Sequence, residues 1–207
     1  SQMRVEHDRD YDGDQSYFSV RLGSTNPNSG SQYAISTKRF DEITGVFSAS
    51  YEIYESSGSG GTEDRSSLAL ANGNGDMAVW FSTNANSNTS LACWSGSAWV
   101  DITTDFTSQN WYSVQMTGNL ATGLYDVFVY DMEAGNALVG SMTGLSILNN
   151  VTNINTVRLS NEEALVGNAG YYHYYDNLTI SSVPVPGAVI LLGTGLLGLV
   201  GFRRRQA

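Results

Sequence analysis

The sequence predicts an all-β protein whose main domain is an antiparallel two-sheet sandwich, followed by a single C-terminal transmembrane helix. Short runs of alternating apolar and polar residues recur along the 207-residue chain, separated by turns rich in Gly, Asn and Ser. From Phe47 to Ile53 every second residue is apolar, as in a strand with one buried face. Before residue 183 no segment has the period of an amphipathic helix, and no repeat indicates a propeller or a solenoid.

The expected strands are short and follow one another closely. The segment 72–76, Asn-Gly-Asn-Gly-Asp, favours a hairpin turn because Asn and Gly accept positive φ at little cost. A second hairpin is expected around Ser95-Gly96-Ser97, and a short helical turn at 145–150. The predicted strands are 3–6, 18–22, 33–35, 46–55, 68–70, 77–83, 91–94, 99–102, 111–117, 125–131, 138–142, 156–160 and 171–180.

Composition narrows the classes of partner. Residues 1–182, the predicted sandwich domain, carry seven basic and all twenty acidic residues of the chain, a net charge of −13. This charge argues against nucleic acid or an anionic membrane surface as a partner, and leaves cations and neutral polysaccharide open. Cys93 is the sole cysteine of the sequence, so no intrachain disulfide can form and the core must supply the stability, with or without a bound cation.

The C-terminal segment 183–207 differs in composition from the rest. Val183-Pro184-Val185-Pro186-Gly187 precedes a span without charged residues at 188–202, and Arg203-Arg204-Arg205 closes it. A helix of this length, extended back to Val183, can cross a hydrocarbon core of roughly 30 Å, with its prolines at the entrance where helices tolerate them. The arginines favour the cytoplasmic side, which places the sandwich domain across the membrane.

This order of parts resembles the PEP-CTERM sorting signal of Gram-negative bacteria, with Val185 where the namesake Glu stands. The resemblance implies an exosortase-type membrane protease as partner, cleavage near the prolines, transient anchoring in the inner membrane and release to the cell surface or outside, often beside exopolysaccharide production. A permanent C-terminal anchor is the alternative. Because such a tail requires export, we expect a signal peptide that was removed or lies upstream of Ser1.

The second half of the domain resembles the concanavalin A-like, or laminin G-like, jelly-roll family. The segments that carry the resemblance are 111–114 (Trp-Tyr-Ser-Val), 124–131 (Leu-Tyr-Asp-Val-Phe-Val-Tyr-Asp) and 175–180 (Tyr-Asp-Asn-Leu-Thr-Ile). It implies an antiparallel two-sheet jelly-roll sandwich, often with a carbohydrate-binding concave sheet. A fold of this kind serves many roles and does not imply catalysis.

Five aspartates are candidate Ca²⁺ ligands. Asp8, Asp10 and Asp12 alternate before Gly13 and are followed by Asp14, like the start of a calcium loop whose carboxylates converge on one ion. The position of the bidentate Glu in an EF-hand holds Ser19 instead, so an acidic hairpin tip is the alternative. The resemblance implies that Asp176 is a further structural calcium ligand. The alternative is that Asp176 is a hydrogen-bonded aspartate at the end of a strand.

Five aromatic or imidazole side chains are candidate ligand-binding residues, because a ring offers flat apolar area that can stack on a sugar. Trp94 and Trp99 flank the predicted turn at 95–97 and are the tryptophans most expected to be exposed. Tyr171, His173 and Tyr175 share one face of the last strand, and the alternative is that this face covers the core.

Catalysis is not expected. Glu52 and Glu55 lie three apart on one strand, hence on opposite faces, and a glycosidase needs paired carboxylates on one face. His7, His173 and Cys93 offer little for a hydrolytic triad. We therefore expect an exported, exosortase-processed protein of the cell surface or biofilm matrix that binds exopolysaccharide or another carbohydrate. The alternatives are a self-associating structural matrix protein and a polysaccharide-active hydrolase.

Overall fold

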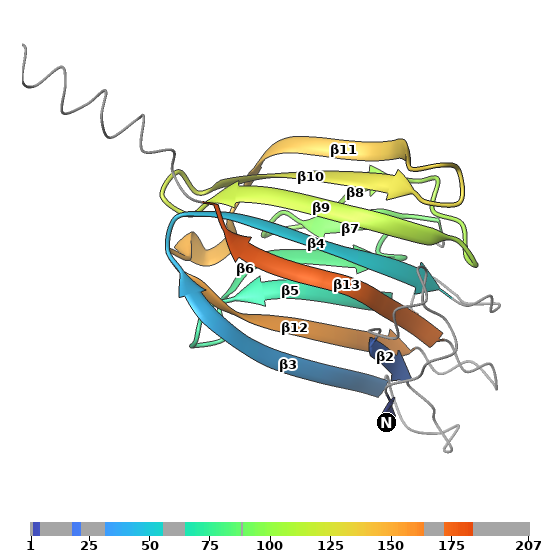
Figure 1. Cartoon of the computed structure of the whole chain (residues 1–207), viewed down its shortest axis with the longest axis horizontal. Coiled ribbons are helices and arrows are strands. Elements are labelled where there is room, and N and C mark those ends of the chain that lie inside the picture. The colour runs from blue at the N-terminus through green and yellow to red at the C-terminus, as the bar shows by residue number, and fades with distance from the viewer. Residues whose placement is uncertain are drawn as a thin grey trace, which may run out of the picture.

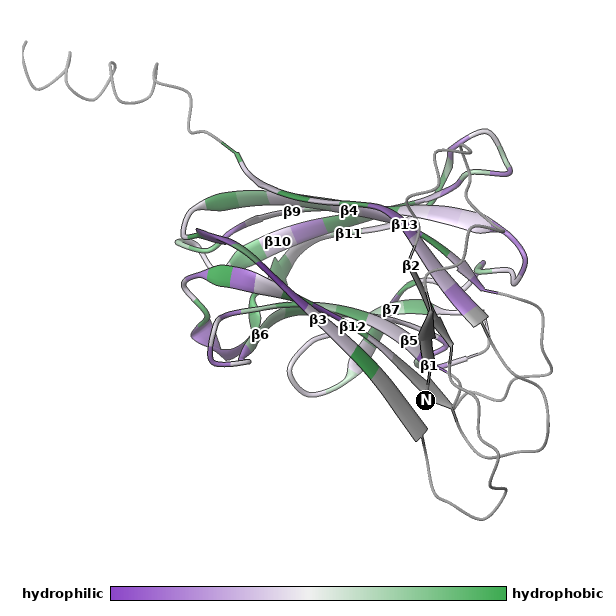
Figure 2. Cartoon of the chain, turned by 60° about the horizontal axis from the view of Figure 1, so that its bottom comes forward, coloured by the Kyte–Doolittle hydropathy of each residue, from purple (hydrophilic) through white to green (hydrophobic). Residues whose placement is uncertain are grey.

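Two antiparallel sheets lie face to face in the computed structural model of the chain, which describes residues 2–4, 18–21, 32–55, 65–87, 89–163 and 172–183 (Figure 1). The seven-stranded sheet has the order β1-β2-β13-β4-β9-β10-β11, and the six-stranded sheet has the order β3-β12-β5-β6-β7-β8. Figure 2 shows the same two layers from a second direction. The all-β sandwich predicted from alternation is confirmed.

Each predicted strand has a counterpart in the structure, but β5, β11 and β12 are longer than predicted, and β3 differs most. It runs for twelve residues because it pairs with β12 over most of its length, where only 33–35 was expected. The expected helical turn at 145–150 shrinks to η1 (Leu148–Asn150), since β11 continues to Ser146. The strands are β1 (Gln2–Arg4), β2 (Phe18–Arg21), β3 (Gln32–Ile43), β4 (Val46–Glu55), β5 (Arg65–Ala71), β6 (Met77–Thr83), β7 (Leu91–Trp94), β8 (Trp99–Thr103), β9 (Trp111–Asn119), β10 (Leu124–Asp131), β11 (Ala137–Ser146), β12 (Ile154–Glu163) and β13 (Tyr172–Ser182).

The hydrophobic core fills the space between the sheets. On β4 every second residue from Phe47 to Ile53 is at most 1% exposed, so the predicted face is the inner one. It meets Leu68 and Leu70 of β5 and Phe81 of β6 from the other sheet. Burial of this apolar area stabilises the fold by about 25 cal/mol per Å² removed from water, which offsets the absence of a disulfide.

Three buried tyrosines make the fold sensitive to alkali. Burial raises the pKa of Tyr51, Tyr125 and Tyr175 above the ordinary value of 10.0. The unfolded chain releases these protons near pH 10, whereas the folded chain keeps them. Stability should therefore be complete below pH 10 and fall above it, by about 1.4 kcal/mol per pH unit for each tyrosine.

Tyrosinate absorbance and circular dichroism, followed together during an alkaline titration, measure this effect. We expect part of the tyrosinate signal to rise only when the sheet signal is lost. If all tyrosines ionise gradually near pH 10 while the sheet signal persists, the prediction is wrong.

Candidate functional site

Three tryptophans gather on the outer face of the six-stranded sheet. Trp80 of β6, Trp94 of β7 and Trp99 of β8 are partly exposed and point away from the core. Their ring centroids lie 6.0 Å (Trp80–Trp94), 5.0 Å (Trp80–Trp99) and 5.4 Å (Trp94–Trp99) apart, in tilted and edge-to-face arrangements. We call these three residues the tryptophan face.

The β7–β8 hairpin holds two of these rings together. Trp94 and Trp99 are cross-strand partners on either side of the turn, where Gly96 has φ 96° and Ser95 N–H donates to Ala98 O at 2.9 Å. Cross-strand pairs on one face have neighbouring side chains, so the two rings must meet. The expected adjacency of Trp94 and Trp99 at the hairpin is therefore present, with both rings partly exposed.

Trp80 was not among the expected ligand-binding residues. It stands in an apolar run, between Val79 and Phe81, and both of those neighbours are buried in the core. Alternation along β6 therefore turns Trp80 outward. Its strand partner is Ala69 of β5, a small side chain that is covered by its neighbours and only 2% exposed. The pattern that could have predicted this outward-facing ring is a tryptophan between two inward-facing apolar residues.

His173 and Tyr175 lie elsewhere. The structure corrects their expected exposure, because they are 1% and 2% exposed and face the interior of the sandwich. The His173 Nε2 atom lies 3.7 Å from Glu55 Oε2, and the Tyr175 hydroxyl is hydrogen-bonded to Ser66 Oγ. The alternative interpretation, a face that covers the core, is therefore the one observed for both residues. Tyr171 lies outside the described residues.

Glu55 and Glu52 occupy opposite faces of β4, as expected. Glu55 points inward, is 6% exposed, and accepts hydrogen bonds from Asn84 Nδ2 at 3.0 Å (Oε1) and 3.2 Å (Oε2). Glu52 is on the outer face and accepts a hydrogen bond from Asn177 Nδ2 at 3.1 Å. The two carboxylates cannot act on one bond from opposite sides of a sheet.

Asp176 is buried on the outer side of β13, next to Glu52 of β4. Its Oδ1 accepts the backbone N–H of Asn177 at 2.8 Å, where Asn177 adopts φ 48° in a β-bulge. In the described part of the chain no three His, Cys, Asp or Glu side chains gather as metal ligands. Asp8, Asp10, Asp12 and Asp14 lie outside the described residues, so a calcium site built from them stays a prediction.

A second aromatic cluster lies on the outer face of the seven-stranded sheet, and its side chains are buried. Tyr54, Trp111 and Tyr174 pack against one another with centroid distances of 5.3 and 5.7 Å, and Met132 completes the group. All four are at most 7% exposed. They leave little ring surface for a ligand, unlike the tryptophan face.

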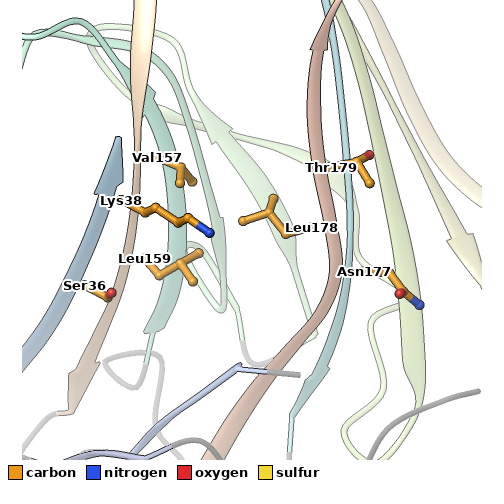
Figure 3. Close-up of a pocket in the computed structure, with 7 residues that line it drawn as sticks. All are labelled: Ser36, Lys38, Val157, Leu159, Asn177, Leu178 and Thr179. Atoms are coloured by element: carbon orange, nitrogen blue, oxygen red, sulfur yellow. The ribbon is translucent and has the colours of Figure 1, made fainter. Parts of the chain in front are cut away.

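A pocket of about 390 Å³ opens between the two sheets, where β3 and β12 face β13 (Figure 3). Leu178 reaches into it from the β-bulge, and the Lys38 side chain extends from β3 toward Leu178 (Figure 3). The pocket is on the inner side of β3 and β12, away from the tryptophan face. Its lining is Ser36, Lys38, Val157, Leu159, Asn177, Leu178 and Thr179.

The arrangement is that of a jelly-roll sandwich, and comparison with solved structures agrees. Arcelin-5, a lectin-like defense protein from Phaseolus vulgaris, is similar with a TM-score of 0.58 and 10% identity over 87% of this chain and 90% of its own. A sialidase is similar with a TM-score of 0.60 and 10% identity over 81% of this chain, which spans 15% of the sialidase.

A structure of botulinum neurotoxin type C, described as dependent on two ganglioside molecules for cell entry, has a TM-score of 0.50 at 10% identity. The similarity covers 95% of this chain and 45% of the neurotoxin chain. At such low identities these likenesses establish the fold alone. No curated protein sequence matches the chain.

Residues 182–205 match the family model of the PEP-CTERM protein-sorting motif. The chain therefore carries the signal of an exported protein that is transiently anchored in a membrane and processed by an exosortase, a membrane protein. The motif begins where β13 ends, at Ser182, and the Val183 N–H still donates to Val46 O at 2.8 Å.

The rest of the tail has no structural description. Pro184, Val185, Pro186, Gly187, the predicted span 188–202 and Arg203, Arg204 and Arg205 lie outside the described residues. Within the described ranges, no helix has the length and apolar character needed to span a bilayer.

Proposed function

We propose that the sandwich domain is a non-catalytic polysaccharide-binding module, which acts at the cell surface or in the extracellular matrix after exosortase processing. The tryptophan face is the observation that carries this proposal. Large aromatic side chains bury area readily, and a cluster of three left partly exposed on a sheet needs a reason. Flat rings with a polar N–H at the edge suit the apolar faces and hydroxyls of sugar rings.

The same geometry weighs against a hydrolase. Glu52 and Glu55 are separated by the sheet, and Glu55 is hydrogen-bonded inside the core. Near the tryptophans the outward carboxylate is Asp101, whose Oδ1 accepts a hydrogen bond from Asn86 Nδ2 at 2.8 Å. Asn86 also donates to Trp99 O at 3.3 Å, so Asp101 helps to fix the β8 strand. This pairing suits a rigid binding surface.

Some similar structures have descriptions that concern carbohydrate. The sialidase name and the two gangliosides of the neurotoxin belong to those proteins, and support the proposal only through a shared fold. The export signal adds that this domain works outside the cytoplasm, where polysaccharides are abundant. The tryptophan face remains the main support for the proposal.

Truncation of the tryptophans tests the proposal. Retention of the purified domain on a panel of immobilised polysaccharides, measured by affinity electrophoresis, should reveal at least one ligand. Trp94→Ala and Trp99→Ala should each weaken that binding by about tenfold or more, because a central ring of a binding surface contributes more than 1 kcal/mol.

Leu138→Ala is the matched control, since Leu138 is 55% exposed on β11 of the other sheet. It should bind as the unaltered protein does. Melting curves of all variants report whether the fold is kept. Binding that persists unchanged in Trp94→Ala and Trp99→Ala, or no retention on any polysaccharide, would refute the proposed function.

A further inference from the structure

Basic side chains are unevenly placed in this acidic protein. The four whose side chains the structure describes, Lys38, Arg39, Arg65 and Arg158, all lie on β3, β12 and β5, which are consecutive in the six-stranded sheet. Arg39 and Arg158 point to its outer face, because their neighbours Lys38 and Val157 face the pocket between the sheets. The outer face therefore carries arginines on one half and the tryptophan face on the other.

Strand register places Arg158 in line with Trp80. Arg158 is the partner of Ala69, and Ala69 is the partner of Trp80, so the three form one row across β12, β5 and β6. Adjacent strands are about 4.8 Å apart, which separates the backbones of Arg158 and Trp80 by about 10 Å. Ala69 between them is small and only 2% exposed, so larger neighbours cover it, and this separation is short enough for the long Arg158 side chain to reach a group bound against Trp80.

Arg39 extends the basic half. It is opposite Thr156, while Arg158 is opposite Thr37, so the two arginines are diagonal neighbours on one face. Among the described residues the side chains of Arg39 and Arg158 form no ion pair or hydrogen bond. In a chain with twice as many acidic as basic residues, two adjacent arginines without a carboxylate are an unusual feature. Guanidinium groups bind carboxylates with two parallel hydrogen bonds, which makes a carboxylate the natural partner.

We propose that the ligand of the tryptophan face is an acidic polysaccharide, with sugar rings stacked on Trp80, Trp94 and Trp99 and ring carboxylates bound by Arg158 and Arg39. This inference rests on the proposed function and specifies its substrate class. Asp101, beside Trp99 at the far edge of the sheet, disfavours a carboxylate there and orients the charged part of the ligand toward β12. The local arginines overcome the net negative charge of the chain only at short range, because salt screens charges beyond roughly 8–10 Å.

Polygalacturonate and its fully methyl-esterified form make a matched pair of probes, since they share a backbone and differ in charge. Titration calorimetry with the whole sandwich domain should show about tenfold tighter binding to the charged polymer, with that preference falling as salt rises. Arg158→Gln should remove the preference and leave binding to the esterified polymer unchanged. Lys38→Gln removes the same charge from the inner side of the adjoining strand and should leave the preference intact.

The outcomes separate this inference from the proposed function. Equal binding to both polymers, unaffected by Arg158→Gln but lost in Trp94→Ala, would overturn the acidic ligand and keep carbohydrate binding. Binding to dextran sulfate as tight as to polygalacturonate, and insensitive to Trp94→Ala, would reveal ion exchange and overturn the inference. Absence of binding to every polymer would overturn both. A melting curve of Arg158→Gln within about 2 °C of the unaltered protein would show that the fold is intact, since exposed substitutions change stability little.

Discussion

Replacing Gly140 by alanine should destabilise the sandwich by about 3 kcal/mol, the upper part of the usual range for overpacking. Gly140 lies on β11, the edge strand of the seven-stranded sheet, and is in close contact with β8, the edge strand of the six-stranded sheet. A Cβ at this position would lie 2.5 Å from the Ile102 backbone oxygen and 2.8 Å from Thr103 Cβ. A backbone oxygen cannot rotate out of the way as a side chain can, so β8 and β11 would have to separate.

Thermal unfolding followed by circular dichroism measures this effect. For a domain of this size, 3 kcal/mol corresponds to a decrease in Tm of about 6–12 °C. Gly45→Ala is the matched control, because a Cβ there would meet no atom within 4 Å, and its Tm should stay within about 2 °C of the unaltered protein. If the Tm of Gly140→Ala equals that of Gly45→Ala, β11 tolerates displacement, and its close contact with β8 does not constrain the fold.

The second large effect concerns the sorting motif. In a bacterial host that contains an exosortase, the exported chain should be converted almost completely from a membrane-bound form to a shorter released form. The paired substitution Pro184→Ala and Pro186→Ala should leave the full-length form in the membrane fraction, because it alters the proline motif next to the expected cleavage position while the apolar span 188–202 is kept.

Immunoblots of membrane and culture fractions, combined with mass spectrometry of the C-terminal peptide, measure the conversion. Pro27→Ala is a control that changes a proline far from the motif in the sequence and should be processed normally. A host without exosortase should retain every form in the membrane. If the unaltered chain also stays full-length and membrane-bound in the competent host, the tail is a permanent anchor.

Alternation in the sequence was sufficient to predict where strands occur and which of their residues share a face, but it underestimated the lengths of β3, β11 and β12. It could not say which face is inside where both faces of a strand carry aromatic side chains. The last strand shows this limit: His173 and Tyr175 alternate with Tyr174 as expected, yet all three are buried, two facing the interior of the sandwich and Tyr174 within the outer aromatic cluster. Only the packing of the neighbouring strands decides such a case.

The candidate site was predicted in part for a related reason. Trp94 and Trp99 were found because a short turn forces their adjacency, which is a local property of the sequence. Trp80 and Arg158 are brought to the same face by the register of β12, β5 and β6. Pairing between strands that are distant in sequence cannot be predicted from a local pattern. The length of β3 was underestimated because charged residues such as Lys38 and Arg39 are typical of loops. In the structure they belong to a strand at the edge of the sheet.

The junction between β13 and the tail has a mechanical consequence. β13 pairs with β4 at eight register positions up to Ser182, and the Val183 N–H still donates to Val46 O at the start of the sorting motif. Tension on the tail, from an anchor in the bilayer or from a protease drawing it in, is transmitted first to β13, and we consider the case in which it acts along the axis of that strand. The β13–β4 hydrogen bonds lie across that axis and bear the load together in shear. The domain can be held or pulled by its C-terminus without the strands peeling apart one bond at a time.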